Sequence, residues 1–285
     1  MLVKSREKSK MPIKCSRNLD EYCFEEKINT GTFGEVSLYK NRTGMRFAIK
    51  KFIYKNSGTV HLTTLREIKN LLKLDCHQNL IRIEEIVVKN GVIYAVFPFY
   101  KKSLSGLKYE FMKDLKNHFK QILNGVRFMH DKKIIHRDLK AANILIDSRD
   151  TIKIIDMGMS RTISPTMTSL VTTLWYRAPE LLEFGTKACY TSYDCSVDIW
   201  SLGIILLEML IGQPPFKGNS EIEQLKMLKK ELLNLNNRFY FLNEDAKEIL
   251  KGMLNFNPKE RFSIEEILES QFLQNIDLNE KVNYL

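Results

Sequence analysis

The sequence predicts an α+β fold with two lobes, a small β-rich lobe followed by a larger helical lobe. Up to about residue 98, short apolar runs alternate with Gly-bearing and polar turns, which is typical of strands. Beyond about residue 100, apolar residues recur at helical spacing over much longer stretches. With 285 residues, 44% of them apolar, the chain is long enough to form two abutting cores.

The first lobe is predicted to contain five strands and one helix. The strands are expected over residues 22–28, 35–40, 45–53, 81–88 and 92–97, with a Gly-bearing turn over 30–34 between the first two. After the third strand, Leu65, Ile68, Leu71 and Leu72 fall on one face of a predicted helix.

The second lobe is predicted to be mainly helical. Its first helix follows from the spacing of Phe111, Leu115, Phe119, Ile122 and Val126. Two short strands are expected over 144–146 and 152–155, then helices over 197–210, 222–233, 244–254 and 264–269. Pro98 marks the junction, so the expected division is 20–98 and 99–274 within a domain over 20–274, with a C-terminal tail over 275–285.

Composition excludes several classes of protein. The five Cys are scattered without a C-x-x-C pair, which favours reduced thiols in the cytosol or nucleus over disulfides or a zinc site. The longest apolar stretch, residues 199–211, is too short to span a membrane, and the polar start of the chain predicts no signal peptide.

The net charge of +10 is concentrated partly in residues 1–19, which are predicted to form a basic, disordered tail. A nuclear-import or nucleic-acid patch is the alternative, because charge alone identifies no partner.

The stretch from His136 to Asn143, His-Arg-Asp-Leu-Lys-Ala-Ala-Asn, carries the strongest chemical signal. Phosphoryl transfer requires a positioned nucleophile and neutralised phosphate charge. Asp138 can accept the proton of a hydroxyl, and Lys140 can meet charge on the transferred phosphate. Asn143 and Asp156 supply the oxygen ligands that Mg²⁺ prefers. A single Asp or Asn is usually a turn or cap residue, but this ordered set argues against that interpretation.

These residues resemble the catalytic residues of the protein kinase family, and the resemblance extends over about residues 20–274. It implies the bilobal protein kinase fold and transfer of the γ-phosphate of ATP to Ser or Thr, with ATP and Mg²⁺ bound between the lobes. Lys50 matches the family's strand lysine and Glu67 its ion-pair partner. The alternative for Glu67 is a capping box with Thr64.

The same resemblance implies two architectural contacts and a nucleotide site. Glu180 should pair with Arg261, and Asp198 should brace the catalytic loop. The residues implied in nucleotide binding are Ile28, Asn29, Thr30, Gly31, Thr32, Phe33, Gly34, Val36, Ala48, Lys50, Glu67, Phe97, Pro98, Tyr100 and Asp156. Asn29 replaces the first Gly of the family's Gly-rich loop, and Met157 replaces the usual Phe after Asp156.

Two segments, 63–68 and 171–180, resemble the cyclin-dependent kinases. The resemblance implies a cyclin bound at the helix around Leu65, Arg66 and Glu67. It also implies phosphorylation at Thr168, with Arg66, Arg137 and Arg161 converging on the phosphate. Three ordinary surface arginines are the alternative. A mitogen-activated kinase would carry Thr-x-Tyr in this loop, and residues 166–168 contain no Tyr.

Further motifs are most similar to those of the transcription-elongation branch of the cyclin-dependent kinases. This resemblance implies phosphorylation at Ser/Thr-Pro sites, with the tail of RNA polymerase II as a substrate. It also implies a location in the nucleus, or in the nucleus and the cytoplasm. Thr172 stands where the group usually has Val, which weakens the expectation of proline direction. The group's insert before residue 243 is much shortened here. The alternatives are a cell-cycle member, a pseudokinase scaffold or a nucleic-acid module. Direct nucleic-acid binding is not expected, because no recognition motif is present.

Overall fold

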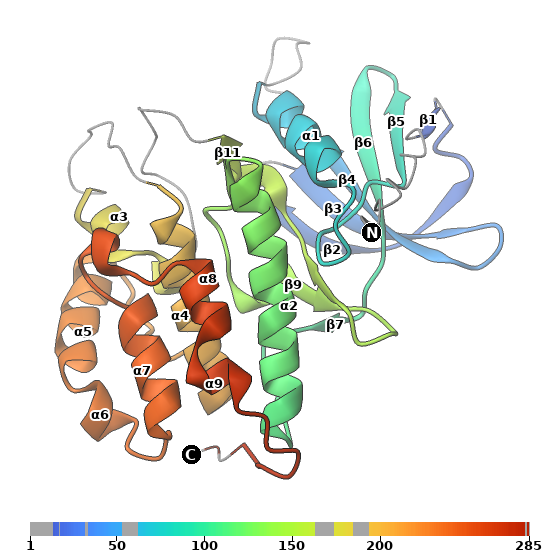
Figure 1. Ribbon diagram of the computed structural model, residues 1–285. Coiled ribbons are helices and arrows are strands. Elements are labelled where there is room, and N and C mark those ends of the chain that lie inside the picture. The colour runs from blue at the N-terminus through green and yellow to red at the C-terminus, as the bar shows by residue number, and fades with distance from the viewer. Residues whose placement is uncertain are drawn as a thin grey trace, which may run out of the picture. The chain divides into compact units, whose positions relative to one another are not determined.

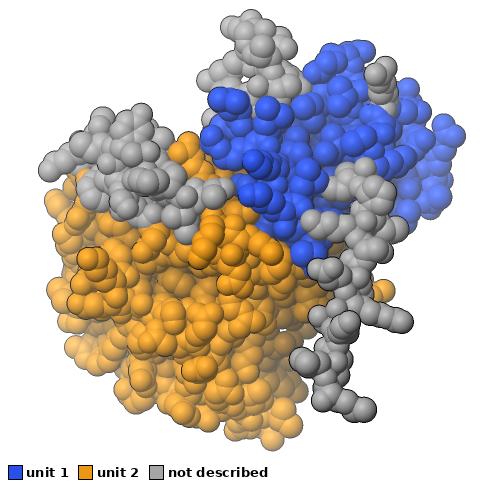
Figure 2. Space-filling view, turned by 45° about the horizontal axis from the view of Figure 1, so that its top comes forward, with its two compact units in different colours: residues 1–76, 81–99 blue, residues 77–80, 100–285 orange. Residues whose placement is uncertain are grey.

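The computed structural model describes residues 14–16, 18–31, 34–52, 62–162, 174–184, 194–282 and 284. They divide into two compact units, shown in blue and orange in Figure 2. Unit 1 runs to Cys76 and includes Ile81–Phe99, and unit 2 comprises His77–Leu80 and Tyr100 onwards. The α+β fold with a β-rich first part and a helical second part is confirmed (Figure 1).

Unit 1 is built on a six-stranded sheet with the order β1-β5-β6-β4-β3-β2. Its strands are β1 Lys14–Ser16, β2 Tyr22–Gly31, β3 Gly34–Asn41, β4 Arg46–Phe52, β5 Glu85–Lys89 and β6 Val92–Pro98. One face of the sheet forms a core of Ile49, Val87 and Val96, flanked by partly buried Tyr and Phe rings. The helix α1, Leu62–Leu74, follows β4 and buries Glu67, Leu71 and Leu74.

The prediction of a disordered tail over residues 1–19 is wrong for its last part. Lys14–Ser16 form β1, which pairs in parallel with Glu85–Val87 at the sheet edge. The Lys14 ammonium lies 3.6 Å from the buried carboxylate of Glu85. A three-residue strand has too few residues to show a period, and its partner lies seventy residues away, so no local pattern could reveal it.

Unit 2 is organised around α4, Ser196–Ile211, in which every residue from Val197 to Leu210 is buried. The helix packs against α2, Met112–Asp131, and α7, Glu244–Met253. The remaining helices are α3 Pro179–Phe184, α5 Glu221–Leu233, α6 Leu235–Arg238, α8 Ile264–Glu269 and α9 Gln271–Gln274. A helix that is apolar on all sides is stable in water only when other elements surround it.

Short strands in unit 2 shape the loops that carry the predicted catalytic residues. They are β7 Lys102–Ser103, β8 Ile134–Ile135, β9 Ile144–Ile146, β10 Ile152–Ile154 and β11 Arg161–Thr162. β7, β9 and β10 form one antiparallel sheet, and β8 pairs with β11. Residues 136–143 therefore lie between β8 and β9, and residues 155–160 between β10 and β11.

Two details differ from the predicted lobe division. The unit boundary falls between Phe99 and Tyr100, one residue later than predicted. The turn after α1 also belongs to unit 2, because Asn79 donates to Gln121 and to the Ile152 carbonyl, and its own carbonyl accepts from Ile154. The strand predicted from residue 81 accordingly begins only at Glu85.

Candidate active site

Asp138 lies at the centre of a hydrogen-bonded cluster in unit 2. Its carboxylate accepts from the Lys140 ammonium at 2.9 Å and from the Asn143 amide at 3.2 Å. The same amide group donates to the Asp138 carbonyl at 2.9 Å. Asp138, Lys140 and Asn143, which the sequence picked out separately, are thus brought together. With its NH₂ group committed to Asp138, Asn143 has its side-chain oxygen left for a cation.

Asp198 stabilises the loop that carries Asp138 through hydrogen bonds, as predicted. The buried Asp198 carboxylate accepts from the backbone N–H groups of His136 and Arg137, both at 2.9 Å. Arg137 adopts a left-handed backbone conformation with φ of 68°, which is uncommon for a residue other than Gly. A fully buried carboxylate that accepts hydrogen bonds from two backbone N–H groups stabilises such a turn strongly.

His130, on the last turn of α2, completes this support and was not predicted. Its Nε2 lies 2.8 Å from Asp198 Oδ2. Burial lowers the pKa of His130, but the hydrogen bonds and charges of Asp198 and Cys195 together outweigh burial and raise the pKa to about 10. Burial also raises the pKa of Asp198, and the imidazolium overcomes this effect and lowers it. The pair is therefore ionised at neutral pH. A lone His on a helix gives no sequence signal for such a role.

Asp156 leads out of β10 into the turn Met157–Met159 with a left-handed backbone at φ of 64°. Its carboxylate accepts from Gly158 N–H at 3.3 Å and is exposed. Met157 is fully buried, which confirms that Met can fill the apolar position usually taken by Phe. The exposed carboxylate of Asp156 and the oriented oxygen of Asn143 are donors of the kind that Mg²⁺ takes, so the residues present fit this cofactor.

In unit 1, Lys50 and Glu67 form the predicted ion pair. The Lys50 ammonium lies 2.5 Å from Glu67 Oε1, and both side chains are nearly buried. Thr64 is the third residue of α1 and not the residue that precedes the helix, so the capping-box alternative for Glu67 is wrong. Lys50 is held on β4, the third strand of the sheet counted from β2.

The other predicted nucleotide residues of unit 1 lie on neighbouring strands. Asn29 pairs with Val36, Val36 with Lys50, and Ala48 with Phe97. Ile28 and Thr30 flank Asn29 on β2, and Gly31 ends that strand opposite Gly34. A Cβ at Gly34 would lie 2.4 Å from the Lys51 carbonyl oxygen, so only Gly fits there. Pro98 ends β6, and Tyr100 is the first residue of the second segment of unit 2. Thr32 and Phe33 lie outside the described residues.

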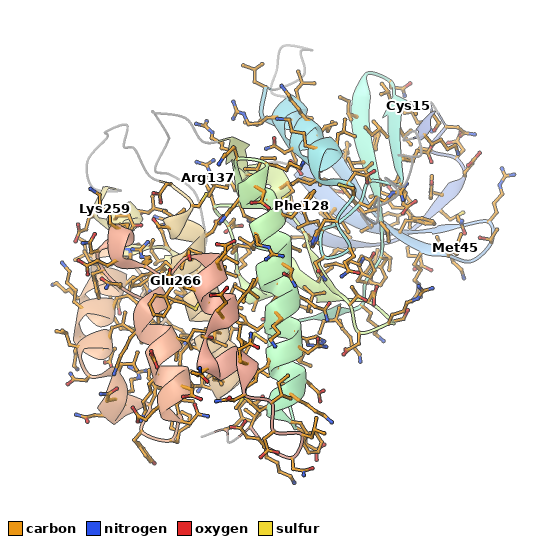
Figure 3. All side chains as sticks on the ribbon, in the orientation of Figure 1. Cys15, Met45, Phe128, Arg137, Lys259 and Glu266 are labelled. Atoms are coloured by element: carbon orange, nitrogen blue, oxygen red, sulfur yellow. The ribbon has the colours of Figure 1, made fainter. Side chains whose placement is uncertain are left out.

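The activation segment is described only at its two ends. Arg137 donates from Nε to the Met159 carbonyl, and Arg161 begins β11 (Arg137 is labelled in Figure 3). Among the described residues, the buried Nε of Arg161 has no hydrogen-bond partner. Arg66 lies on α1. Thr168 and Thr172 lie outside the described residues, so the predicted convergence on Thr168 remains a prediction.

The C-terminal end of this segment is anchored to the core of unit 2. Arg261 forms two hydrogen bonds to the Glu180 carboxylate, at 2.7 and 2.6 Å, as predicted. Tyr176 donates to Glu208 at 2.6 Å, and burial raises the pKa of Glu208. The Tyr176–Glu208 contact was not predicted, because it joins residues thirty-two apart and no sequence pattern links them.

Comparison with known proteins agrees with this geometry. The protein kinase domain matches residues 22–273. A probable cell division protein kinase of Encephalitozoon cuniculi is 38% identical over 221 residues, covering 75% of this chain and 69% of the relative. The chain is a protein kinase of the cyclin-dependent family. It is accordingly a Ser/Thr kinase, which transfers phosphate from ATP to proteins.

Two further relatives are a CTD kinase homolog and a named cyclin-dependent kinase. A probable CTD kinase subunit alpha homolog of E. cuniculi is 35% identical over 283 aligned positions, covering 87% of the kinase and 82% of the relative. Cyclin-dependent kinase G-2 of Oryza sativa subsp. indica is 31% identical, covering 94% of the kinase. The kinase spans only 44% of the length of the rice protein.

Proposed function

We propose that this kinase phosphorylates Ser or Thr through Asp138, Lys140, Asn143, Lys50 and Asp156. Asp138 orients the substrate hydroxyl and takes its proton. The hydroxyl oxygen forms the new bond to the γ-phosphorus, the bond from this phosphorus to the β–γ bridging oxygen breaks, and ADP leaves. Lys50 holds the α- and β-phosphates, and Lys140 meets charge on the transferred group. The single observation that carries this proposal is the hydrogen-bonded cluster around Asp138.

Mg²⁺ is the metal for which Asn143 and Asp156 are best suited, and when bound it neutralises phosphate charge. The protein's contribution is to fix the two oxygen donors. Asn143 is fixed by the hydrogen bonds that its side-chain NH₂ group donates to Asp138. Asp156 is fixed by its left-handed backbone conformation and by the hydrogen bond from the N–H of Gly158. The adenine side of the site is assigned to Ile28, Val36, Ala48 and Phe97, with backbone contacts from Pro98 and Tyr100.

A cyclin is the proposed activating partner, and α1 the proposed contact. Leu62 and Leu65 are 73% and 50% exposed on this helix, although both are large apolar residues. A partner that covers them would also fix the helix that holds Glu67 against Lys50. We further propose that phosphorylation of Thr168 recruits Arg66, Arg137 and Arg161. The buried Nε of Arg161, which has no hydrogen-bond partner within the described part of the chain, supports this role for that residue.

The proposed substrates are Ser/Thr-Pro segments, including the tail of RNA polymerase II, and the proposed location is the nucleus. The name of the CTD kinase relative and the resemblance to the transcription-elongation branch support this assignment. A cell-cycle role is the alternative, supported by the relative named as a cell division protein kinase. Among the described residues, none of the helices has the length and hydropathy to cross a membrane.

The decisive experiment purifies the full chain from its native extract and assays it with radiolabelled ATP. A cyclin-box protein is expected to copurify, and phosphate transfer to a Ser-Pro peptide is expected to need it. Replacing Asp138 by Asn should reduce transfer by at least a hundredfold while ATP still binds. Unchanged turnover in Asp138→Asn would contradict the mechanism. An active monomer lacking phosphate at Thr168 would contradict the regulatory part.

A further inference from the structure

The helix α5 exposes an apolar and basic stripe on the side opposite its buried face. Ile222, Lys226, Lys230 and Leu233 follow one another at spacings of four, four and three residues, which places them on one side of a helix. Gln224 and Leu228 form the buried face. Ile222 is 59% exposed and Leu233 86% exposed, the latter being the highest value among the large apolar residues of the described chain. Eleven residues separate them, which is about 16 Å along the helix.

Two of the three lysines of α5 have no ion-pair partner among the described residues. The nearby acidic groups already have partners. Glu183 pairs with Lys229 at 3.3 Å, Glu231 pairs with Arg238, and Glu223 accepts from the Asn219 N–H. The ammonium groups of Lys226 and Lys230, both on exposed residues, have no ion pair in the described part of the kinase. Two exposed apolar side chains with unbalanced cations between them favour an acidic partner with apolar anchors.

The N-terminal end of α5 is joined directly to the segment that ends the activation loop. Gln224 donates to the Trp175 carbonyl, Trp175 Nε1 donates to the Gly218 carbonyl, and Arg177 forms an ion pair with Glu221. In Figure 1, α5 stands at the outer edge of unit 2, beside α3. The stripe therefore begins next to the segment that leads into Ala178-Pro179-Glu180 and runs away from it.

We infer that the α5 stripe, Ile222, Lys226, Lys230 and Leu233, is a docking site for protein substrates that carry an acidic, apolar segment beside the phosphorylated Ser or Thr. This inference rests on the proposed function, since it assigns a substrate class to the same kinase. A docked segment raises the local concentration of the phosphorylation site, so it lowers KM and leaves kcat unchanged. The contact is salt-dependent, because its charges are exposed.

The test uses two peptides with the full chain and any copurified cyclin. The short peptide contains only a Ser-Pro site. The long peptide adds, through a Gly-Ser linker on either side, a helical segment with two Leu eleven residues apart and Glu between them. We expect the long peptide to have a KM about tenfold lower than the short one, with the difference lost as NaCl is raised to about 0.3 M.

The paired variants are Leu233→Asp and the double change Lys226→Glu with Lys230→Glu. Each should remove the advantage of the long peptide while turnover of the short peptide stays the same. Leu278→Asp and Lys259→Glu are matched controls, because Leu278 is 63% exposed and Lys259 is exposed elsewhere on unit 2 (Lys259 is labelled in Figure 3). These controls should keep the advantage of the long peptide.

A second measurement does not depend on catalysis. The fluorescently labelled helical segment alone should bind the kinase in an anisotropy titration, and both α5 variants should weaken binding at least tenfold. If neither peptide is phosphorylated but this binding holds, the proposed function fails and the docking site stands. Equal binding to the wild type and to both α5 variants, or no binding to the wild type, overturns the inference.

Discussion

At the scale of single residues, Lys50 offers the sharpest test of the nucleotide site. Its ammonium group is nearly buried and is 2.5 Å from Glu67, so removal of the carboxylate charge leaves a buried cation without compensation. Replacing Glu67 by Gln should lower kcat/KM for ATP by about ten- to a hundredfold, which corresponds to about 1–3 kcal/mol. Steady-state kinetics with varied ATP measures this loss.

The neighbouring Lys51 provides the control for Lys50, because it lies on the same strand and is exposed. Lys51→Met should leave kcat/KM for ATP within about twofold of the wild type, since exposed charges contribute little, whereas Lys50→Met should abolish measurable turnover. Equal losses in the two variants would refute a specific role for the buried ion pair.

His130 predicts a pH dependence of stability. Because its pKa is raised in the folded kinase to about 10, the stabilisation that it provides is fully present below about pH 6.5 and is lost as pH rises toward 10. The difference in free energy of unfolding between the wild type and His130→Gln should fall over this window by at most about 1.4 kcal/mol per pH unit. Urea unfolding at several pH values measures it.

His77 is the matched control for His130 because its pKa moves in the opposite direction. Burial, then the charges of Arg127 and Lys153, lower its pKa below the ordinary value. The neutral form is therefore favoured by folding, and His77→Gln should differ from the wild type in its pH dependence only below about pH 6.5. A pH dependence above pH 7 that persists in His130→Gln would assign the effect to another group.

At the scale of secondary structure, the sequence predicts elements whose period is long and regular. The helices α4, α5 and α7 lie within one residue of their predicted bounds, because several turns of apolar spacing define each of them. The six-residue α8 also has its predicted bounds. The sequence could not reveal β1, β8 and β11, since each has two or three residues and exists only through a distant partner. The helices α6 and α9, with four residues each, are too short to show a helical period, and α3 was not predicted either.

The residues of the candidate site also divide into those that the sequence predicts and those that only the structure reveals. Asp138, Lys140 and Asn143 are predictable because phosphoryl transfer constrains both residue type and spacing. His130 is not, because any residue that supports Asp198 from α2 would satisfy the fold, and only the buried contact reveals its identity.

The packing of the C-terminal segment against the end of α4 can be tested at Gly212. This residue ends α4 with φ of +79°, and a Cβ there would lie 3.0 Å from the ring of Tyr284. Gly106 has nearly the same φ, +74°, with open space around it. Gly212→Ala should therefore cost about 1 kcal/mol more than Gly106→Ala, since both share the backbone strain and only one meets the ring. Thermal unfolding measures both.

The double variant Gly212→Ala with Tyr284→Ala separates packing from backbone strain at the end of α4. Tyr284 also accepts from the Tyr109 N–H and lies under the Lys108 ammonium, so its removal has a cost of its own. Relative to Tyr284→Ala alone, the added cost of Gly212→Ala should match that of Gly106→Ala. An added cost as large as in the wild-type background would show that Tyr284 does not rest on Gly212.

At the scale of the whole molecule, ligand binding links the assigned residues to global stability. A ligand present at a hundred times its Kd stabilises the folded protein by about 2.7 kcal/mol, whatever contacts it makes. ATP with Mg²⁺ should therefore raise the Tm of the wild type, and EDTA should remove the part that depends on the metal. Asp156→Asn should retain only the shift seen with EDTA, because its carboxylate is one of the two proposed metal donors. Asp131→Asn, a change at an exposed residue at the end of α2, should behave as the wild type.

If Asp156→Asn showed the full metal-dependent shift in Tm, the metal site would lie elsewhere. If Lys50→Met also kept the full shift, the assigned phosphate site would be wrong too, since the buried Lys50 is the cation assigned to the α- and β-phosphates.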